Sequence, residues 1–273
     1  MNLADALEVV TRTDPGMIRS HNEDAVFGDA ALGLAILADG MGGYNAGEVA
    51  SGMATTLLAT NFSRIIPGSQ PQSREADGEA QAHRLLNEQI ADTNSAIFNA
   101  AESQPQYAGM GTTLVLAWFY DNFLSVAHVG DSRLYRLRGE KFEQITRDHS
   151  LLQEQLDSGT ITAEEARYSQ NKNLVTRALG VDPVVEPEIR DYLVRAGDIY
   201  LLCSDGLNDM VEDEEMALAL SALGGNLSLA ADHLVQLAND YGGRDNISVI
   251  LVKVLGDYSA PKGWWQRLLG CLK

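Results

Sequence analysis

Apolar and polar positions divide the chain into strand-rich and helix-rich blocks. Continuous or alternating apolar runs rich in β-branched residues predict strands, whereas apolar positions three and four residues apart predict helices. The predicted strands cover residues 7–13, 25–27, 34–38, 112–120, 123–129, 133–137, a short segment around 142, 188–194, 199–203 and 246–254. The predicted long helices cover residues 46–63, 79–102, 213–222 and 228–241.

The order of these blocks indicates the fold class. Strands come first, then two helices, a run of strands joined by short turns, two more helices and a last strand. Short turns such as Asp121-Asn122 join antiparallel neighbours, because parallel strands need long crossovers. The pattern therefore predicts an α+β domain with two antiparallel sheets covered by helices. A doubly wound sheet is the alternative.

Residues 148–180 depart from this pattern, because they carry polar helical pieces with few core positions. Ser150 is expected to cap a helix over 151–157 that ends at Gly159. Thr162 and Glu165 form a capping box that starts the next helix. We interpret the segment as a surface excursion, either a flap over a site or a decorated connection.

Composition and charge exclude several classes of partner. The 273 residues are 45% hydrophobic, with 38 acidic against 20 basic residues and a net charge of −18. Nucleic acid and anionic membranes repel such a surface, so neither is expected as the main partner. The two cysteines, Cys203 and Cys271, suit a reducing compartment. With neither a secretory leader nor a spanning segment in the sequence, we expect a cytoplasmic protein.

Four aspartates occupy turns beside apolar strands, and three of them adjoin glycine. They are Asp39, Asp131, Asp205 and Asp245. Each alone is typical of a turn, but four unpaired carboxylates at the edge of a core require a compensating cation. Oxygen ligands without Cys or His favour Mg²⁺ or Mn²⁺ over Zn²⁺. The glycines near Asp39 do not fit a nucleotide-binding G-x-G-x-x-G pattern.

Short motifs in a fixed order extend this interpretation over nearly the whole chain. They are Thr13-Asp-x-Gly16-x-x-Arg19-x-x-Asn22-Glu23-Asp24, Asp39-Gly40-Met41-Gly42-Gly43, Gly111-Thr112-Thr113, Gly130-Asp131-Ser132-Arg133, Asp148-His149-Ser150, Thr176-Arg177-Ala178, Ser204-Asp205-Gly206-Leu207 and Asp245-Asn246. One such motif is a weak signal, but the ordered set is highly specific. By these motifs the chain resembles the bacterial form of the metal-dependent protein phosphatases of the PP2C type, the PPM family.

The resemblance implies a fold and an activity. The fold is a β-sandwich of two antiparallel sheets flanked by pairs of antiparallel helices, with a catalytic domain over residues 1–256 and a flap at about 148–180. The activity is hydrolysis of phosphoserine and phosphothreonine in proteins by a water that bridges two Mn²⁺ or Mg²⁺ ions, without a phosphoenzyme. Protein groups then mainly position the substrate and neutralise charge.

The resemblance also implies ligands for the two ions. Asp39 bridges both ions, and the Gly40 carbonyl binds one of them. Asp205 and Asp245 hold the other ion.

Further roles follow from the same resemblance. Glu23 and Asp24 act through metal-bound waters, and Asp131 joins Asp205 at a third, weaker metal site. Arg19 clamps the substrate phosphate, since its planar guanidinium suits a dianion. Met41 stands where animal members carry a histidine proposed as general acid, so the proton donor is unassigned and a metal-bound water is our hypothesis.

Two other features limit the resemblance. His21 lies near the right motif, but a lone loop histidine is more often a hydrogen-bonded structural residue. Residues 168–171 replace the Asn-His-Pro-Gln of many bacterial members, so contacts of the flap with substrate are not carried over.

The tail, residues 257–273, is separate from these motifs. It carries an apolar helical stripe edged by basic residues, which comprises Trp264, Trp265, Leu268, Leu269 and Leu272. Two interpretations stand equally: a helix that docks on a partner protein or a membrane surface, or a segment that packs on its own domain or frays.

The expected partners are phosphorylated proteins, including a cognate eukaryotic-type Ser/Thr kinase and its substrates, and components of a type VI secretion apparatus, in a signal-transduction role. A monomer is expected. The alternative function is a catalytically weak binding or sensor module on the same fold, which the intact Arg19, Asp39, Asp205 and Asp245 disfavour.

Overall fold

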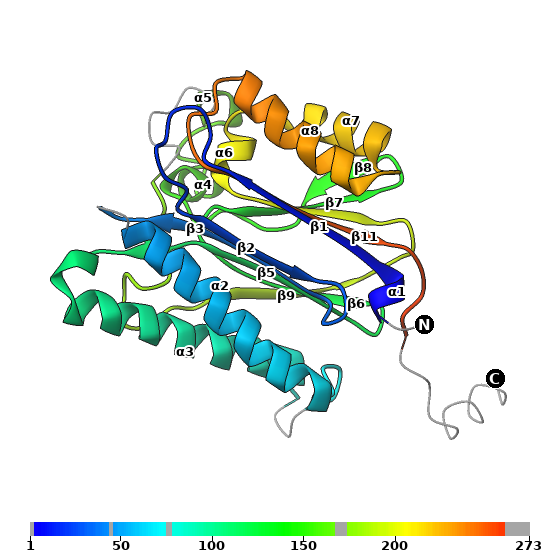
Figure 1. The fold of residues 1–273 in the computed structure, drawn as a ribbon, viewed down its shortest axis with the longest axis horizontal. Helices are drawn as coiled ribbons and strands as arrows, with labels where there is room; N and C mark the ends of the chain where they lie inside the picture. The colour runs from blue at the N-terminus through cyan, green and yellow to red at the C-terminus, as the bar shows by residue number, and fades with distance from the viewer. Residues whose placement is uncertain (1–2, 44–45, 75–77, 167–173, 260–273) are drawn as a thin grey trace.

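Two antiparallel sheets pack face to face in the computed structural model, with a pair of long helices outside each sheet (Figure 1). The structure describes residues 3–43, 46–74, 78–166 and 174–259. The strands are β1 (Leu7–Asp14), β2 (Asp24–Asp29), β3 (Leu34–Met41), β4 (Gly111–Thr112), β5 (Leu114–Tyr120), β6 (Phe123–Val129), β7 (Arg133–Arg138), β8 (Lys141–Gln144), β9 (Glu188–Leu193), β10 (Ile199–Cys203) and β11 (Ile247–Val254). The α-helices are α1 (Leu3–Ala6), α2 (Ala46–Ile65), α3 (Gln81–Ser103), α4 (Leu151–Asp157), α5 (Ala163–Ala166), α6 (Asp205–Asn208), α7 (Asp213–Leu223) and α8 (Leu227–Asp240), and η1 (Ile66–Gly68) and η2 (Pro105–Tyr107) are 3-10 turns.

The sheet topology confirms the predicted fold class. One sheet has the strand order β1-β11-β10-β7-β8, and the other has the order β2-β3-β5-β6-β9 with β4 paired to β3. Every pairing between these named strands is antiparallel. The doubly wound alternative is wrong, because its strands would run parallel.

Three apolar layers hold the domain together. The middle layer lies between the sheets and includes Leu37 and Tyr200. The outer layers lie between a sheet and its helices: Phe62 and Trp118 mark the layer under α2 and α3, and Leu234 marks the layer under α8. Each fully buried side chain of this size contributes about 1.5–3 kcal/mol, so the layers fix where the strand ends lie.

The strand bearing the first aspartate is longer than predicted. The sequence placed Asp39 in a turn after residue 38, but β3 continues to Met41 because Gly40 pairs with Thr112 and Met41 with Gly111. The predicted strand over 112–120 is correspondingly divided into β4 and β5. Asp39 therefore lies inside a strand, where it pairs with Asp24 of β2 on one side and bonds to Thr113 on the other.

The described part of the excursion after residue 148 has the predicted caps. Ser150 Oγ accepts the Gln153 N–H at 3.2 Å and so caps α4. The Thr162 N–H donates to Glu165 Oε2 at 2.8 Å, and the Glu165 N–H donates to Thr162 Oγ1 at 3.2 Å, which closes the box before α5. Residues 168–171 lie outside the described residues.

The last described residues pack on the domain. Tyr258 is buried in the layer between the sheets, and its N–H donates to Asn122 Oδ1 at 2.9 Å. The apolar stripe at 264–272 lies outside the described residues. Among the residues that the structure does describe, no helix is long and apolar enough to cross a membrane.

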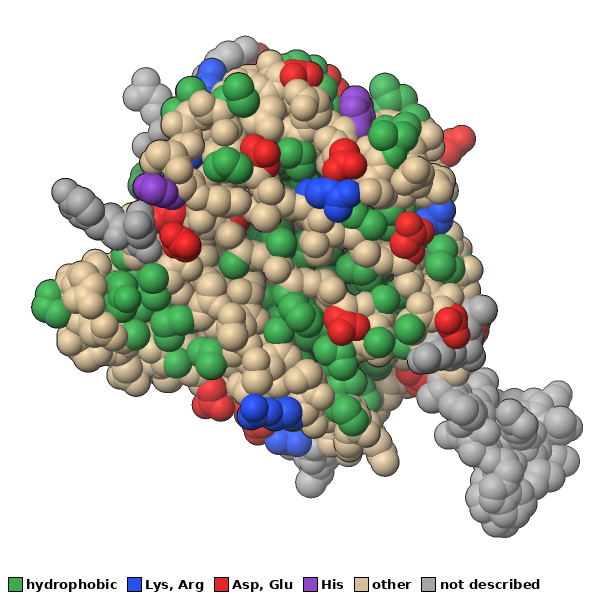
Figure 2. Space-filling view, in the orientation of Figure 1, with side chains coloured by type: hydrophobic (Ala, Val, Ile, Leu, Met, Phe, Trp, Pro, Cys, Tyr) green, Lys and Arg blue, Asp and Glu red, His purple; other side chains and the backbone are tan. Residues whose placement is uncertain are grey.

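Acidic side chains are spread over the face shown in Figure 2. Lys and Arg side chains on the described part of this face form no broad basic patch (Figure 2). This distribution agrees with the net charge of −18.

Candidate active site

Five aspartates from distant segments lie close enough for their charges to interact. Asp205 begins α6, which lies at the same end of the sandwich as the start of α2 (Figure 1). Asp24 begins β2 and pairs with Asp39 of β3. Asp131 follows β6, and Asp245 precedes β11. Burial raises the pKa of Asp39 and of Asp205 well above the ordinary value, and repulsion from the neighbouring carboxylates adds to it. The cluster therefore carries more negative charge than the protein alone stabilises.

The backbone of Asp39 is held by Thr112, the last residue of β4, and by Thr113, which follows it. Its N–H donates to Thr113 Oγ1 at 3.1 Å. Its carbonyl oxygen accepts from Thr112 Oγ1 and from the Thr113 N–H, both at 2.9 Å. Asp39 is partly buried, and these hydrogen bonds fix the backbone from which its carboxylate projects.

Asp24 has an oxygen for which the described protein supplies no donor. Its Oδ2 accepts from Ser204 Oγ at 2.8 Å, whereas its Oδ1 is buried without a hydrogen-bond partner in the described part of the chain. Burial raises its pKa. A buried carboxylate oxygen without a donor is costly, and a cation or the water bound to it would satisfy this atom. The donor set, all oxygen, therefore fits the Mg²⁺ or Mn²⁺ that the sequence predicts.

The first turn of α2 packs directly on β3 at Gly40. A Cβ on Gly40 would lie 2.2 Å from the Gly47 carbonyl oxygen and 2.5 Å from that of Glu23, so only glycine fits. The Gly40 N–H donates to the Glu23 carbonyl at 3.1 Å. Burial raises the pKa of the Glu23 carboxyl, although the N–H groups of Gly47 and Glu48 favour its ionised form. Close helix packing is thus a reason for Gly40 that the sequence did not indicate.

Arg19 and Asp245 contact each other. Arg19 Nη2 donates to Asp245 Oδ2 at 2.7 Å, and the Arg19 side chain is 51% exposed. Asp245 Oδ1 accepts the Asn246 N–H at 2.9 Å. The predicted phosphate clamp and one predicted metal ligand therefore form an ion pair at the mouth of the site.

Asn246 organises this end of the site, a role that the sequence reasoning missed. Its Oδ1 accepts the Glu23 N–H at 2.8 Å, and its Nδ2 donates to the carbonyl oxygens of Pro15 and His21 at 3.0 and 2.9 Å. One buried amide thus fixes the loop that carries Arg19. An Asn directly after a site Asp was the available signal.

Asp131 lies in the turn between β6 and β7. Burial, with the nearby charges of Asp148 and Asp209, raises the pKa of Asp131 to about 6. The next residue links this turn to the Asp39 strand, because Ser132 Oγ lies 2.7 Å from Thr113 Oγ1.

The structure assigns no leaving-group acid at Met41, where animal members carry a histidine, or at His21. Met41 is partly buried at the end of β3. The side chain of His21 is exposed, and its carbonyl supports Asn246. The general acid therefore stays unassigned.

Comparison with known proteins agrees with this geometry. The sequence profile of the family "Protein phosphatase 2C" matches residues 19–239. The serine/threonine protein phosphatase PstP of Mycobacterium tuberculosis is 41% identical over 252 residues, which are 92% of this chain but only 46% of that protein. The chain thus spans about half the length of PstP. The serine/threonine phosphatase stp of Listeria innocua is 41% identical over 89% of this chain and 94% of its own.

Solved structures give the same result. The catalytic domain of PstP in complex with two manganese ions has a TM-score of 0.79 at 40% identity, covering 92% of this chain and 99% of that one. PppA, described as a key regulatory component of T6SS in Pseudomonas aeruginosa, has a TM-score of 0.76 at 34% identity over 92% and 98% of the two chains. The profile match and these relatives confirm the resemblance found in the motifs: the chain belongs to the PP2C family of protein phosphatases.

Proposed function

We propose that this protein hydrolyses phosphoserine and phosphothreonine esters in proteins with the help of two divalent ions. One observation carries the proposal: buried and partly buried carboxylates from five segments converge beside a half-exposed arginine, and one carboxylate oxygen there has no donor within the described residues. Family membership and the printed names of PstP and stp support the same activity.

Four groups of the chain are the proposed ligands of the two ions. Asp39, the Gly40 carbonyl, Asp205 and Asp245 would hold two Mn²⁺ or Mg²⁺ ions, with Asp39 shared. When bound, such ions lower the pKa of coordinated water and neutralise charge on a phosphoryl group. The manganese ions in the PstP catalytic domain support this assignment.

Three further acids complete the proposed set. Glu23 and Asp24 would act through water, as the donorless oxygen of Asp24 suggests. Asp131 would join Asp205 at a weaker third site.

Arg19 binds the substrate phosphate in this proposal. Its ion pair with Asp245 uses Nη2, and half of its side chain is exposed. Because the loop is fixed through Asn246, the guanidinium is positioned before substrate arrives.

The proposal extends to the location, partners and domain limits of the protein. The protein would act in cytoplasmic signalling as a monomer and oppose a eukaryotic-type Ser/Thr kinase. The likeness to PppA supports a role with T6SS components. The limits at residue 256 and around the flap, 148–180, also remain proposals, as does a docking role for the tail. A truncation that tests the tail should end at Ser259, since Tyr258 is buried.

Phosphate release from a phosphothreonine peptide with Mn²⁺ tests the activity. A chelator and the variant Asp39→Asn should each lower the rate by at least about a hundredfold, because each removes preorganised charge stabilisation. Asp92→Asn, on the exposed face of α3, is the matched control and should keep wild-type activity. Turnover that survives both treatments would refute the metal mechanism. Peptide binding without turnover in the wild type would favour the alternative, a binding or sensor module.

A further inference from the structure

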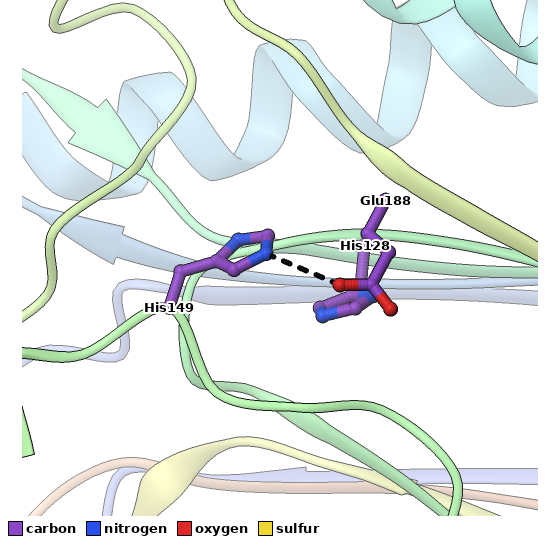
Figure 3. Close-up of side chains that lie close together, drawn as sticks. All are labelled: His128, His149 and Glu188. Carbon is purple, nitrogen blue, oxygen red and sulfur yellow. Dashed lines mark ion pairs between the residues drawn. The ribbon is translucent and has the colours of Figure 1, made fainter. Parts of the chain in front are cut away.

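Two histidines and a glutamate meet beside the aspartate cluster. His128 comes from β6, His149 precedes α4, and Glu188 begins β9. Their ligand atoms lie within 4.8 Å of one another, and the imidazole of His149 points toward the Glu188 carboxylate (Figure 3). The two imidazoles stack with centroids 4.7 Å apart. This residue set is one that zinc favours, and no step proposed above uses it.

Hydrogen bonds assign the protons of both rings. His128 Nε2 lies 2.8 Å from the carbonyl oxygen of Arg147, which only accepts, so Nε2 carries the proton. His149 Nδ1 accepts the Gly130 N–H at 3.2 Å, so in the neutral ring the proton of His149 is on Nε2.

This tautomer opposes metal binding at the cluster. His149 Nε2 lies 3.9 Å from Glu188 Oε2, too far for a hydrogen bond. It has no hydrogen-bond partner within the described segments, and the residue is only 8% exposed. Its proton occupies the position where a metal would need a lone pair. The cluster is therefore better explained by what His149 Nδ1 holds.

His149 joins the aspartate turn to the flap. It bonds Gly130 twice, because its own N–H also donates to the Gly130 carbonyl at 2.9 Å. Gly130 has φ +102°, and a Cβ there would lie 2.7 Å from the Thr113 side chain, so the turn has little freedom. The His149 carbonyl accepts the Thr176 N–H at 2.8 Å, which ties the start of the excursion to the segment that returns from it.

We propose that His149 is a positioning residue: its Nδ1 lone pair fixes the Gly130 N–H and thereby the turn that presents Asp131. The proposal rests on the assignment of Asp131 as a metal ligand made under the proposed function. Without the acceptor, a buried N–H is left unpaired and the turn shifts to find water.

Two variants separate the acceptor from the ring. His149→Asn keeps an acceptor near the position of Nδ1 but loses the ring, whereas His149→Phe keeps the ring and its stacking but loses the acceptor. The Mn²⁺ concentration for half-maximal activity, and the Mn²⁺ affinity measured by electron paramagnetic resonance, should change about tenfold in the Phe variant. Both should stay within about threefold of wild type in the Asn variant. At saturating Mn²⁺, kcat should be similar in all three proteins. Glu188→Gln is the control that leaves Nδ1 untouched.

Long-range ¹H–¹⁵N spectra of the metal-free wild-type chain test the proposal directly, whatever the variants do. They should show the proton on His149 Nε2 and a slowly exchanging Gly130 amide. A proton on Nδ1, tight Zn²⁺ binding that His149→Phe abolishes, or wild-type Mn²⁺ dependence in His149→Phe would overturn it. A wild-type enzyme that needs no Mn²⁺ refutes the proposed function instead, and these spectra still decide the role of His149.

Discussion

Replacing Asp131 with asparagine should stabilise the metal-free protein at neutral pH. Asp131 is 7% exposed, and burial raises the pKa of its carboxyl from the ordinary 3.8 to about 6. A raised pKa means that the folded state holds the proton more tightly than the unfolded state does. Between pH 3.8 and 6 the unfolded chain loses this proton while the folded chain still holds it, so the free energy of unfolding falls as the pH rises through this range. An uncharged isostere avoids that loss.

The magnitude follows from the shift of about two pH units. Each unit corresponds to about 1.4 kcal/mol, so the full penalty is about 3 kcal/mol at pH 7.5. It grows as the pH rises from 3.8 to 6 and is below about 1 kcal/mol at pH 4. Asparagine loses some backbone hydrogen bonding, so Asp131→Asn should gain about 2–3 kcal/mol, which is about 4–10 °C in Tm for a chain of this size.

Urea unfolding in chelator at pH 7.5 and at pH 4 measures this gain. The control is Asp92→Asn on the exposed face of α3, which should change the free energy of unfolding by less than about 0.5 kcal/mol. Saturating Mn²⁺ should shrink the advantage of Asp131→Asn, because ion binding stabilises the folded wild type. The reasoning is refuted if Asp131→Asn is no more stable than wild type at pH 7.5, or if its gain is as large at pH 4.

The glycine and leucine sites give two paired predictions. Gly40→Ala should lower the free energy of unfolding by at least about 2 kcal/mol and weaken Mn²⁺ binding, because the new Cβ would lie 2.2 Å from a backbone carbonyl oxygen. Gly52→Ala should instead stabilise α2 by about 0.5–1 kcal/mol, because a Cβ there would meet no tertiary neighbour within 4 Å among the described residues. Equal effects in urea unfolding would contradict the packing argument. Leu234→Ala should cost about 3 kcal/mol because Leu234 is fully buried, and Leu229→Ala, 51% exposed on the same helix, should cost less than about 1 kcal/mol. A loss at Leu229 as large as that at Leu234 would show that the outer face of α8 is covered in solution.

The sequence predicted the strands and long helices well, because apolar period and turn chemistry are local signals. Asp121 and Asn122, for example, adopt the positive φ angles of 47° and 59° that a tight hairpin needs. The motifs also include acidic residues that the structure brings together, and their roles stay predictions. Local patterns therefore sufficed for the elements and for the candidate ligands.

Long-range pairing is what the local patterns could not give. Asp39 was expected in a turn, but it pairs with Asp24 of β2, and β3 continues past it to Met41 by pairing with residues 111–112, some 70 positions away along the chain. The motif contains Asn246, but its three side-chain hydrogen bonds reach residues more than 200 positions away, which no local pattern could indicate. The short helix α6 had too few residues for a periodic signal.

The pairing of β1 with β11 has a consequence for synthesis of the protein. β1 is an edge strand whose one sheet neighbour is β11, with Asp14 opposite Ile247. During translation β1 therefore has no sheet partner until residues 247–254, which form β11, leave the ribosome. Such long-range pairing slows folding and exposes a strand edge to aggregation. Because Asp245, a proposed metal ligand, arrives with the same segment, a nascent chain gains this carboxylate and the last strand of its sheet together. The proposed phosphatase activity should therefore appear only after β11 has been made.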